Sequence, residues 1–295
     1  MDAAPVIGIA GLGLVGSALA KRLTGAGHTV LGFDVDAARG ALLDTQRPGA
    51  SRTSFALLVA ECDCLVIAVF DDDQLRAVVA ELLTAPLRRV AQVLCITTAL
   101  PATLHTVGGL CTGAGLGFVE APFSGSSAKI AAGEGRMFVG GTAADIDRAA
   151  PLLDAIAVHR EVIGPVGQAS AAKLATNLVL GLNRMALAEG MALAESLGIA
   201  RGRYLALVLD SAASSRAARE KGPMMVADRF EPPVATIAQH AKDVRLMLQL
   251  GREIGQPLPM STLHLELLQQ SIARGDAALD NAAVIRTLRA SHGAR

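Results

Sequence analysis

The stretch Val6-Ile7-Gly8-Ile9-Ala10-Gly11-Leu12-Gly13-Leu14-Val15-Gly16 decides the fold of the first half of the chain. It predicts a short buried strand, a glycine-rich turn and the start of a helix that continues through Leu19 and Leu23. In such a turn the first glycine allows the bend, the second lets a pyrophosphate approach the backbone, and the third lets helix pack on strand. Because the helix N-terminus then faces the phosphates, the stretch predicts a dinucleotide site.

A second apolar strand, Thr29 to Phe33, ends in Asp34. A carboxylate about 20 residues after the glycines accepts hydrogen bonds from the ribose hydroxyls and repels a 2′-phosphate. The sequence therefore favours NAD over NADP, although Arg39 is a nearby cation that argues the other way. The alternative for Asp34 is an ordinary turn or N-cap residue.

Composition bounds the class of protein. The chain has 295 residues, 52% of them apolar and 3% aromatic, with a formal net charge of zero. This length suffices for two domains, and no basic run of the kind that follows nucleic acid is present. No apolar stretch approaches the ~20 residues that cross a bilayer, and the N-terminus lacks the pattern of a signal peptide. We expect a cytoplasmic protein that binds neither nucleic acid nor membrane.

The cysteines and histidines give no support to a metal site. Cys62, Cys64, Cys95 and Cys111 lie on or beside apolar segments and lack metal-site spacing. The six histidines are scattered. We predict buried free thiols and no metal centre.

The order of apolar segments predicts two domains. Short apolar runs alternate with helical stretches through Val162, the βαβ pattern of a doubly wound, mostly parallel sheet. Expected strands lie near 65–69, 93–97, 118–120, 137–139 and 159–162. After Gly164 the periodicity becomes helical, beginning with one long helix from Ala169 to Ser196. Further helices are expected at about 203–211, 223–228, 236–254, 260–274 and 281–290. The prediction is an α/β Rossmann domain over 1–164 and an all-helical domain over 165–295, whose Ala-rich faces could pair with a second copy.

Lys173 is the candidate for proton transfer in a nicotinamide-dependent oxidation of an alcohol. It lies near the start of the long helix, and Asn177 follows at i+4 on the same face. Burial would lower the pKa of this lysine toward the ~7 to 8 that suits acid–base catalysis. Only five of the 27 basic residues are lysines, so a lysine here is more informative than an arginine, which cannot shuttle protons. The alternative is a surface lysine.

A second candidate site is the loop after the strand near 118–120, which reads Glu120-Ala121-Pro122-Phe123-Ser124-Gly125-Ser126. It lies at the carboxyl edge of the predicted sheet, where ligands of open α/β folds bind. Small residues expose backbone N–H groups and the serines add donors, which suits a carboxylate. A flexible Gly/Ser loop is the alternative.

Four motifs in this order resemble the β-hydroxyacid dehydrogenases, the family of 3-hydroxyisobutyrate, tartronate semialdehyde and L-threonate dehydrogenases, related to 6-phosphogluconate dehydrogenase. They are the glycine turn, Thr97-Thr98-Ala99-Leu100-Pro101, the loop from Glu120 to Ser126, and the segment from Gly164 to Asn177. Lys242-Asp243-Val244 and Asp280-Asn281-Ala282-Ala283 extend the likeness toward the C-terminus. The resemblance covers nearly the whole chain.

This resemblance implies a role for each matching residue. Lys173 would be the general acid/base and Asn177 would orient the substrate. Ser124, Gly125 and Ser126 would bind the substrate carboxylate. The remaining implied positions are Thr98 and Lys242 at the cofactor and Asp280 near the mouth of the substrate cleft. The family also implies a helical second domain that forms dimers or tetramers.

The chain departs from the family pattern at three positions of this loop, and the changes at Phe123 and Ser126 touch the predicted pocket. Phe123 stands where the family has a smaller valine, Ser126 replaces a glycine, and Glu120 replaces an aspartate. The expected activity is hydride transfer between NAD and a small 3-hydroxy acid or its semialdehyde. An imine reductase, whose relatives usually carry another residue at the Lys173 position, and an inactive NAD-binding sensor are the alternatives.

Overall fold

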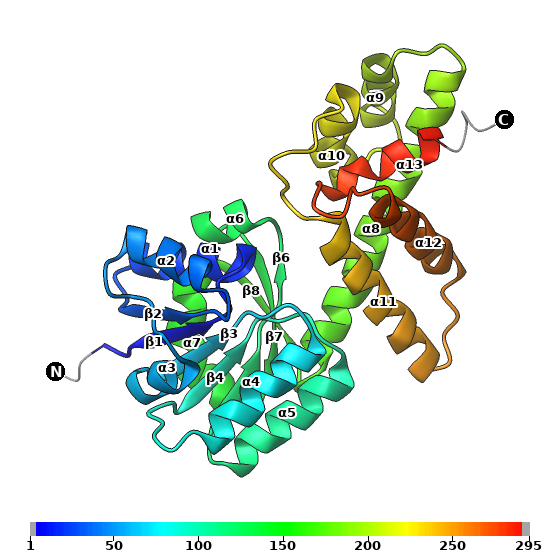
Figure 1. Cartoon of the computed structure of the whole chain (residues 1–295). Helices are drawn as coiled ribbons and strands as arrows, with labels where there is room; N and C mark the ends of the chain where they lie inside the picture. The colour runs from blue at the N-terminus through cyan, green and yellow to red at the C-terminus, as the bar shows by residue number, and fades with distance from the viewer. Residues whose placement is uncertain (1–3, 291–295) are drawn as a thin grey trace. The chain divides into compact units, whose positions relative to one another are not determined.

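The computed structural model describes residues 4–290 and shows two compact units, the first running to Lys173 and the second beginning at Leu174 (Figure 1). The division falls within the long helix α8 (Gln168–Ser196). The helix expected from Ala169 to Ser196 is confirmed. It contributes residues to both units, whereas the predicted domain boundary at residue 164 precedes it.

The first unit is built on one eight-stranded sheet. Its strands are β1 (Ile7–Ala10), β2 (Val30–Phe33), β3 (Cys64–Ile67), β4 (Gln92–Cys95), β5 (Gly117–Glu120), β6 (Phe123–Ser124), β7 (Arg136–Gly141) and β8 (His159–Gly164). The order is β2-β1-β3-β4-β5-β7-β6, with β8 paired to β7. Strands β1 to β5 are mutually parallel, and β7 runs antiparallel to both β5 and β6. The predicted doubly wound, mostly parallel sheet is confirmed.

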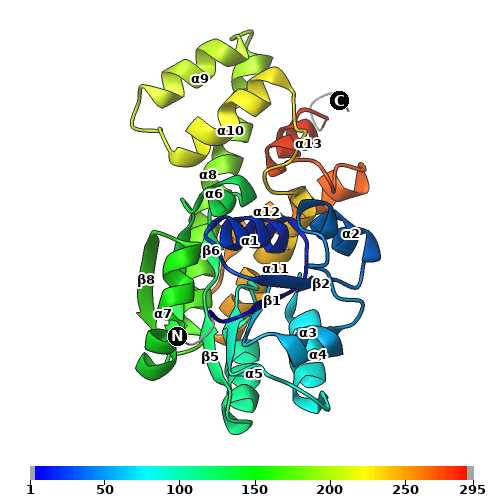
Figure 2. The same ribbon diagram turned by 90° about the vertical axis from the view of Figure 1, so that its left-hand side faces the viewer.

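Helices cover both faces of this sheet because its strands are apolar on both sides. They are α1 (Leu14–Gly25), α2 (Ala37–Gln46), α3 (Phe55–Glu61), α4 (Asp72–Thr84), α5 (Pro101–Gly113), α6 (Ser127–Ala132) and α7 (Ala143–Ile156). Ile7, Ile9 and Val66 face the core that α1, α6 and α7 cover, as Figure 2 shows for those helices. Leu65 and Ile67 face the core under α3, α4 and α5. Successive side chains of a strand thus point to opposite faces of the sheet, and both faces are covered. For this reason a continuous apolar run predicts a buried parallel strand.

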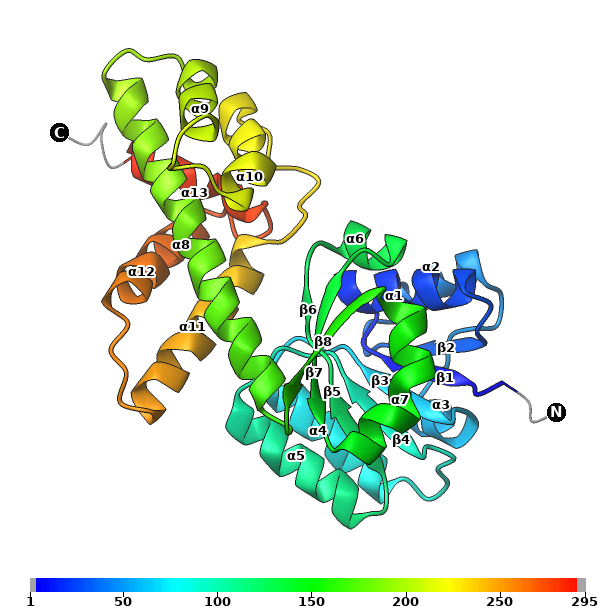
Figure 3. The ribbon, with the colours of Figure 1, turned by 180° about the vertical axis from the view of Figure 1, so that it is seen from behind.

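Within residues 174–290 every regular element after α8 is a helix. These are α9 (Arg201–Leu209), α10 (Arg216–Ala227), α11 (Ile237–Glu253), α12 (Pro259–Ala273), the 3₁₀ turn η1 (Asn281–Ala283) and α13 (Val284–Ala290). Seen from behind, α8 runs along this unit beside α11 and α12 (Figure 3). Its apolar core is built around Met191, Met225 and Val244, which are all fully buried.

Two elements differ from the sequence-based expectation. The helix expected at 223–228 begins at Arg216, because the Ser215 side chain caps it by accepting a hydrogen bond from Ala218 N at 3.0 Å. Pro223 lies inside this helix although it lacks an N–H donor. Because proline is typical of the first turn of a helix, the sequence predicted that the helix begins there. Strand β6 was not expected, since two residues are too few to show a periodicity.

All four cysteines are buried and unpaired, as predicted. Cys62 packs so closely on β1 that a Cβ at Gly8 would lie 2.5 Å from its sulfur. Burial raises the pKa of the Cys62 thiol to about 12, so this thiol is inert. Separately, no helix among residues 4–290 is both long and apolar enough to cross a bilayer.

Candidate active site

The three glycines of the turn are required for different reasons. Gly11 has φ +93°, and a Cβ there would lie 2.6 Å from Ala68 O. A Cβ at Gly16 would lie 1.8 Å from Gly11 O, so no other residue fits. Among residues 4–290, the only atom within 4 Å of a Cβ at Gly13 is Arg39 Nη1, at 3.8 Å. Gly11 and Gly16 are therefore required because the backbone leaves no space for a side chain. Gly13 instead faces open space, which suits the approach of a phosphate.

The N-terminus of α1 is left open to an anion. Its N-cap, Gly13, provides no side-chain acceptor, and the first turn has no acidic residue. The first intrahelical bond runs from Ser17 N to Gly13 O at 2.9 Å, so the N–H groups of Leu14, Val15 and Gly16 precede the hydrogen-bonded ladder. These residues fit the phosphates of a dinucleotide, as the sequence predicts.

Asp34 ties the end of β2 to the glycine turn. Its Oδ2 accepts a hydrogen bond from Leu12 N at 2.7 Å, and its Oδ1 accepts one from Asp36 N at 2.9 Å. Arg39 adds a charge–charge contact, with Nη1 3.3 Å from Asp34 Oδ2 and Nε 3.5 Å from Asp36 Oδ2. The turn role considered for Asp34 is therefore present, and Arg39 partly offsets its negative charge.

A hollow of about 530 Å³ lies beside Asp34. Its lining comes from the end of β2, from α2 and from the segment before α3, and comprises Phe33, Asp34, Val35, Ala37, Gly40, Ala41, Asp44, Ser51, Arg52 and Thr53. A small-residue wall with a carboxylate at its rim fits an adenosine ribose and its base. The position of this hollow agrees with a dinucleotide that extends from the glycine turn.

Thr98 follows β4 at the carboxyl edge of the parallel strands. Its neighbour Thr97 holds this loop, because its Oγ1 accepts from Val69 N at 3.1 Å and donates to Val69 O at 3.1 Å. The loops after β3 and β4 are thereby joined at the edge where ligands bind in such sheets. Thr98 is half-buried there.

The predicted carboxylate loop spans the end of β6 and the start of α6. Ser124 pairs with Arg136 of β7, and Gly125 has φ +140°, which favours glycine. The Ser126 hydroxyl caps α6 by accepting from Lys129 N at 3.2 Å. This cap gives a physical reason for a serine in place of the glycine found in the family.

Glu120 has a role that sequence reasoning missed. It ends β5 with no exposed surface, and its two carboxylate oxygens accept from Ala169 N at 2.9 Å and Ser170 N at 3.2 Å. Burial raises the pKa of Glu120, and these backbone donors oppose that shift. Ser170 Oγ also donates to Ala99 O at 2.5 Å. The start of α8 is thus fixed to the carboxyl edge of the sheet.

Lys173 lies one helical turn beyond Ala169 and is half-buried. Because Glu120 holds the backbone at Ala169 and Ser170, the position of Lys173 depends on the end of β5. The signal for this support was available in the sequence, where an acidic residue ends an otherwise apolar strand. Its partner, however, lies 49 residues away.

Asn177 belongs to a side-chain cluster of the second unit. Its Nδ2 donates to Asp243 Oδ2 at 3.3 Å, and Lys242 Nζ lies 3.1 Å from Asp243 Oδ1. One carboxylate therefore holds two of the predicted site residues. Asp243 was present in the matching Lys242-Asp243-Val244 motif but was not assigned a role.

Asp280 lies in a different environment from the one expected at a cleft mouth. It has no exposed surface, and Lys221 Nζ donates to its Oδ1 and Oδ2 at 2.8 and 2.7 Å. Its oxygens also accept from Val234 N at 2.9 Å and Ala282 N at 3.0 Å. These contacts give Asp280 a structural role at η1. None of them joins Asp280 to Asn177.

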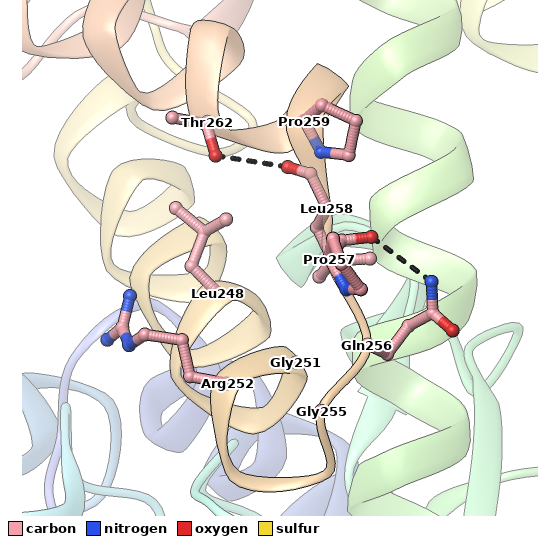
Figure 4. Close-up of a pocket in the computed structure, with 9 residues that line it drawn as sticks. All are labelled: Leu248, Gly251, Arg252, Gly255, Gln256, Pro257, Leu258, Pro259 and Thr262. Atoms are coloured by element: carbon pink, nitrogen blue, oxygen red, sulfur yellow. Dashed lines mark hydrogen bonds between the residues drawn. The ribbon is translucent and has the colours of Figure 1, made fainter.

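A second hollow, of about 510 Å³, lies at the turn between α11 and α12 (Figure 4). Its lining is mostly Leu, Pro and Gly, with Arg252 as the charged member, and none of the predicted site residues contributes to it. Among residues 4–290 no group of three or more His, Cys, Asp or Glu side chains is arranged to hold a metal ion. Neither observation adds a reacting group to the candidate site.

Comparison with known families covers nearly the whole described chain. Residues 6–164 match the family described as the NAD binding domain of 6-phosphogluconate dehydrogenase. Residues 167–288 match the family described as NAD-binding of NADP-dependent 3-hydroxyisobutyrate dehydrogenase. By class, the protein is an NAD(P)-binding oxidoreductase. It belongs to the β-hydroxyacid dehydrogenase family, as the sequence motifs predict.

Individual relatives agree with this assignment. A probable 3-hydroxyisobutyrate dehydrogenase of Mycobacterium tuberculosis is 28% identical, over 96% of this chain and 98% of the relative. The 2-hydroxy-3-oxopropionate reductase of Escherichia coli is 26% identical, over 96% of each chain. A solved structure of the Mycobacterium tuberculosis 3-hydroxyisobutyrate dehydrogenase with L-serine has a TM-score of 0.86 and 26% identity, covering 97% of this chain and all of that one.

Proposed function

We propose that this protein transfers a hydride between NAD and a small 3-hydroxy acid, or the corresponding semialdehyde, with Lys173 as general acid/base. The observation that carries the proposal is the arrangement on α8, where Lys173 lies one turn from the Glu120-anchored start and Asn177 follows on the same face. The open Gly13 in the same unit as Lys173 supports the cofactor part.

Lys173 and Asn177 divide the chemistry between them. In the oxidation direction the neutral Lys173 amine takes the hydroxyl proton while the hydride leaves the substrate carbon, and in reduction the ammonium returns that proton. Asn177, held by Asp243, would donate a hydrogen bond that fixes the substrate orientation. When bound, the nicotinamide supplies or accepts the hydride.

The substrate carboxylate would bind at Ser124, Gly125 and Ser126. The Ser126 oxygen accepts a hydrogen bond from Lys129 N, which leaves its O–H free to act as a donor to an anion. The extra hydroxyl of Ser126 favours a polar acid over a branched aliphatic one, whereas Phe123 is buried in the core of the first unit and does not support a role in the pocket. By family likeness, Thr98 and Lys242 would contact the cofactor; the contacts of Asp280 give no support for substrate binding.

We further propose NAD as the preferred cofactor, with Arg39 weakening the discrimination against NADP. Asp34 disfavours a 2′-phosphate, but Arg39 lies 3.3 Å from that carboxylate and can pair with phosphate instead. The Arg39→Ala variant should raise the ratio of kcat/KM for NAD over NADP roughly 10-fold. The matched control is Arg47→Ala, at an arginine beyond the end of α2 that bonds to His28 O. An unchanged ratio in Arg39→Ala would contradict this role.

A cytoplasmic location and a homodimer or homotetramer formed through the helical unit complete the proposal. Exposed apolar side chains on α8, such as Val179 and Leu193, support the pairing of helical units. Sedimentation at several concentrations measures the assembly. No nucleic-acid or membrane partner is proposed, and the neutral net charge supports that view.

The direct test is reduction of NAD⁺ and NADP⁺, followed at the nicotinamide absorbance, with 3-hydroxyisobutyrate, L-serine, glycerate and threonate as substrates. We expect turnover with NAD⁺ on at least one of them. Silence across the panel, with NADH still binding, would favour the imine reductase or the inactive sensor instead. Reduction of cyclic imines then separates those two.

A further inference from the structure

The face of α8 that carries Asn177 continues to a buried arginine. Gly181 follows at i+4, and Arg184 follows three residues later, so all three lie on one side of the helix. Arg184 has only 2% of its surface exposed, in the core of the second unit. Its Nε and Nη2 are buried and have no hydrogen-bond partner among residues 4–290. Unmatched donors of a buried charge are costly, so the site calls for an acceptor.

Two imidazoles from other helices lie at the same place. His240 of α11 and His264 of α12 have ring centroids 5.0 Å apart, and both are buried. A Cβ at Gly181 would lie 2.7 Å from His240 Nε2 and 2.8 Å from His264 Cε1, so both rings contact α8 there. Within the described part of the chain, the Nε2 atom of each ring is buried and has no hydrogen-bond partner. Three helices thus direct unsatisfied polar atoms into one region.

Four charged groups act on one another around this region. Asp280 acts on both cations, Arg184 and Lys221, and Glu220 also acts on Lys221. Asp280 is already engaged by Lys221 Nζ at 2.7 Å and by backbone N–H groups. Burial and the Arg184 charge lower the pKa of His264 to about 4, and burial first, then Arg184, lowers that of His240, so neither imidazole is charged at neutral pH. The carboxylate that acts on Arg184 is thus Asp280, which is already paired with Lys221.

We infer that the core of the second unit binds one small inorganic monoanion, with chloride as the type, between Arg184 and the imidazoles of His240 and His264. Arg184 offers two donor nitrogens, and each neutral imidazole can place a proton on Nε2, which adds a third and a fourth donor nitrogen. Both rings approach Gly181 closely, which favours a small anion over an organic acid. This site is independent of the reaction proposed above.

Thermal unfolding of the full chain tests the site. Sodium chloride replaces sodium gluconate at constant ionic strength, and the unfolding midpoint is recorded. When the chloride concentration is ten times the Kd of the site, binding raises the folding equilibrium constant about 10-fold. This shifts the unfolding midpoint by a few degrees. Arg184→Met should remove this dependence, whereas Arg203→Met, at an exposed arginine on α9, should retain it. A wild-type midpoint that does not respond to chloride would overturn the inference.

Crystals of the wild-type protein grown in bromide give a second test that needs no variant. We expect an anomalous bromine peak beside Arg184, within contact distance of both imidazoles. Ordered water at that position, without an anomalous signal, would show that water satisfies the buried donors and would overturn the anion site.

Discussion

The glycine turn of the first unit and the Asn177–Asp243–Lys242 cluster of the second are both marked by motifs, yet the structure fixes them by different means. At Gly11 and Gly16 the backbone leaves no space for any side chain. Asn177 is instead held by one partner from a distant part of the chain. We therefore expect Gly11 and Gly16 to tolerate no substitution, whereas changes in the cluster should reduce function gradually.

The largest effect is expected at Gly16. Gly16→Ala places a Cβ 1.8 Å from Gly11 O, so the turn must rearrange, and we expect a loss of about 4 kcal/mol or more in unfolding free energy. Gly13→Ala is the matched control, because its Cβ has only Arg39 Nη1 nearby. That variant should lose no more than about 1 kcal/mol, the cost of alanine at an N-cap, but bind NADH more weakly. Equal stability losses in denaturant unfolding would contradict the distinction between the two glycines.

The second unit should lose stability in acid because of a buried histidine. Burial holds the pKa of His264 at about 4, below the ordinary value of 6.5, so the unfolded state binds the proton first as pH falls. Stability is therefore complete above pH 6.5 and declines toward pH 4, by about 3 kcal/mol for this group. Urea unfolding in chloride-free buffer measures the decline. His264→Gln should make the decline shallower and leave the contribution of His240, whereas His159→Gln, at an exposed histidine, should not change it.

The sequence predicts local patterns better than contacts between distant parts of the chain. The glycine turn and the long helix are local patterns, and both were predicted within a residue or so. The cap that Glu120 forms on α8 spans 49 residues, and the bond from Asn177 to Asp243 spans 66. Such pairs become visible only when the sheet order and helix packing are known. Pro223 misled the prediction of α10 because its missing N–H resembles a start signal.

At the site itself, Lys173→Ala should separate chemistry from cofactor binding. Loss of the acid/base should lower turnover ~10²-fold or more, while the glycine turn continues to bind NADH with unchanged affinity. Lys21→Ala, at an exposed lysine on α1, is the control and should turn over normally. Near-normal turnover in Lys173→Ala would disprove the assignment.

The smallest effect is expected at Asp243, a positioning residue for Asn177. Asp243→Asn keeps the size of the side chain but removes the charge that holds both Asn177 Nδ2 and Lys242 Nζ. We expect kcat/KM for the hydroxy acid to fall roughly 10-fold, mainly through KM, since the neutral amide is a weaker acceptor. Glu253→Gln removes an exposed carboxylate of the same helix and should change neither parameter. If Asp243→Asn lowered only the unfolding midpoint and left KM intact, Asp243 would be a structural residue and the cluster would resemble the glycine turn after all.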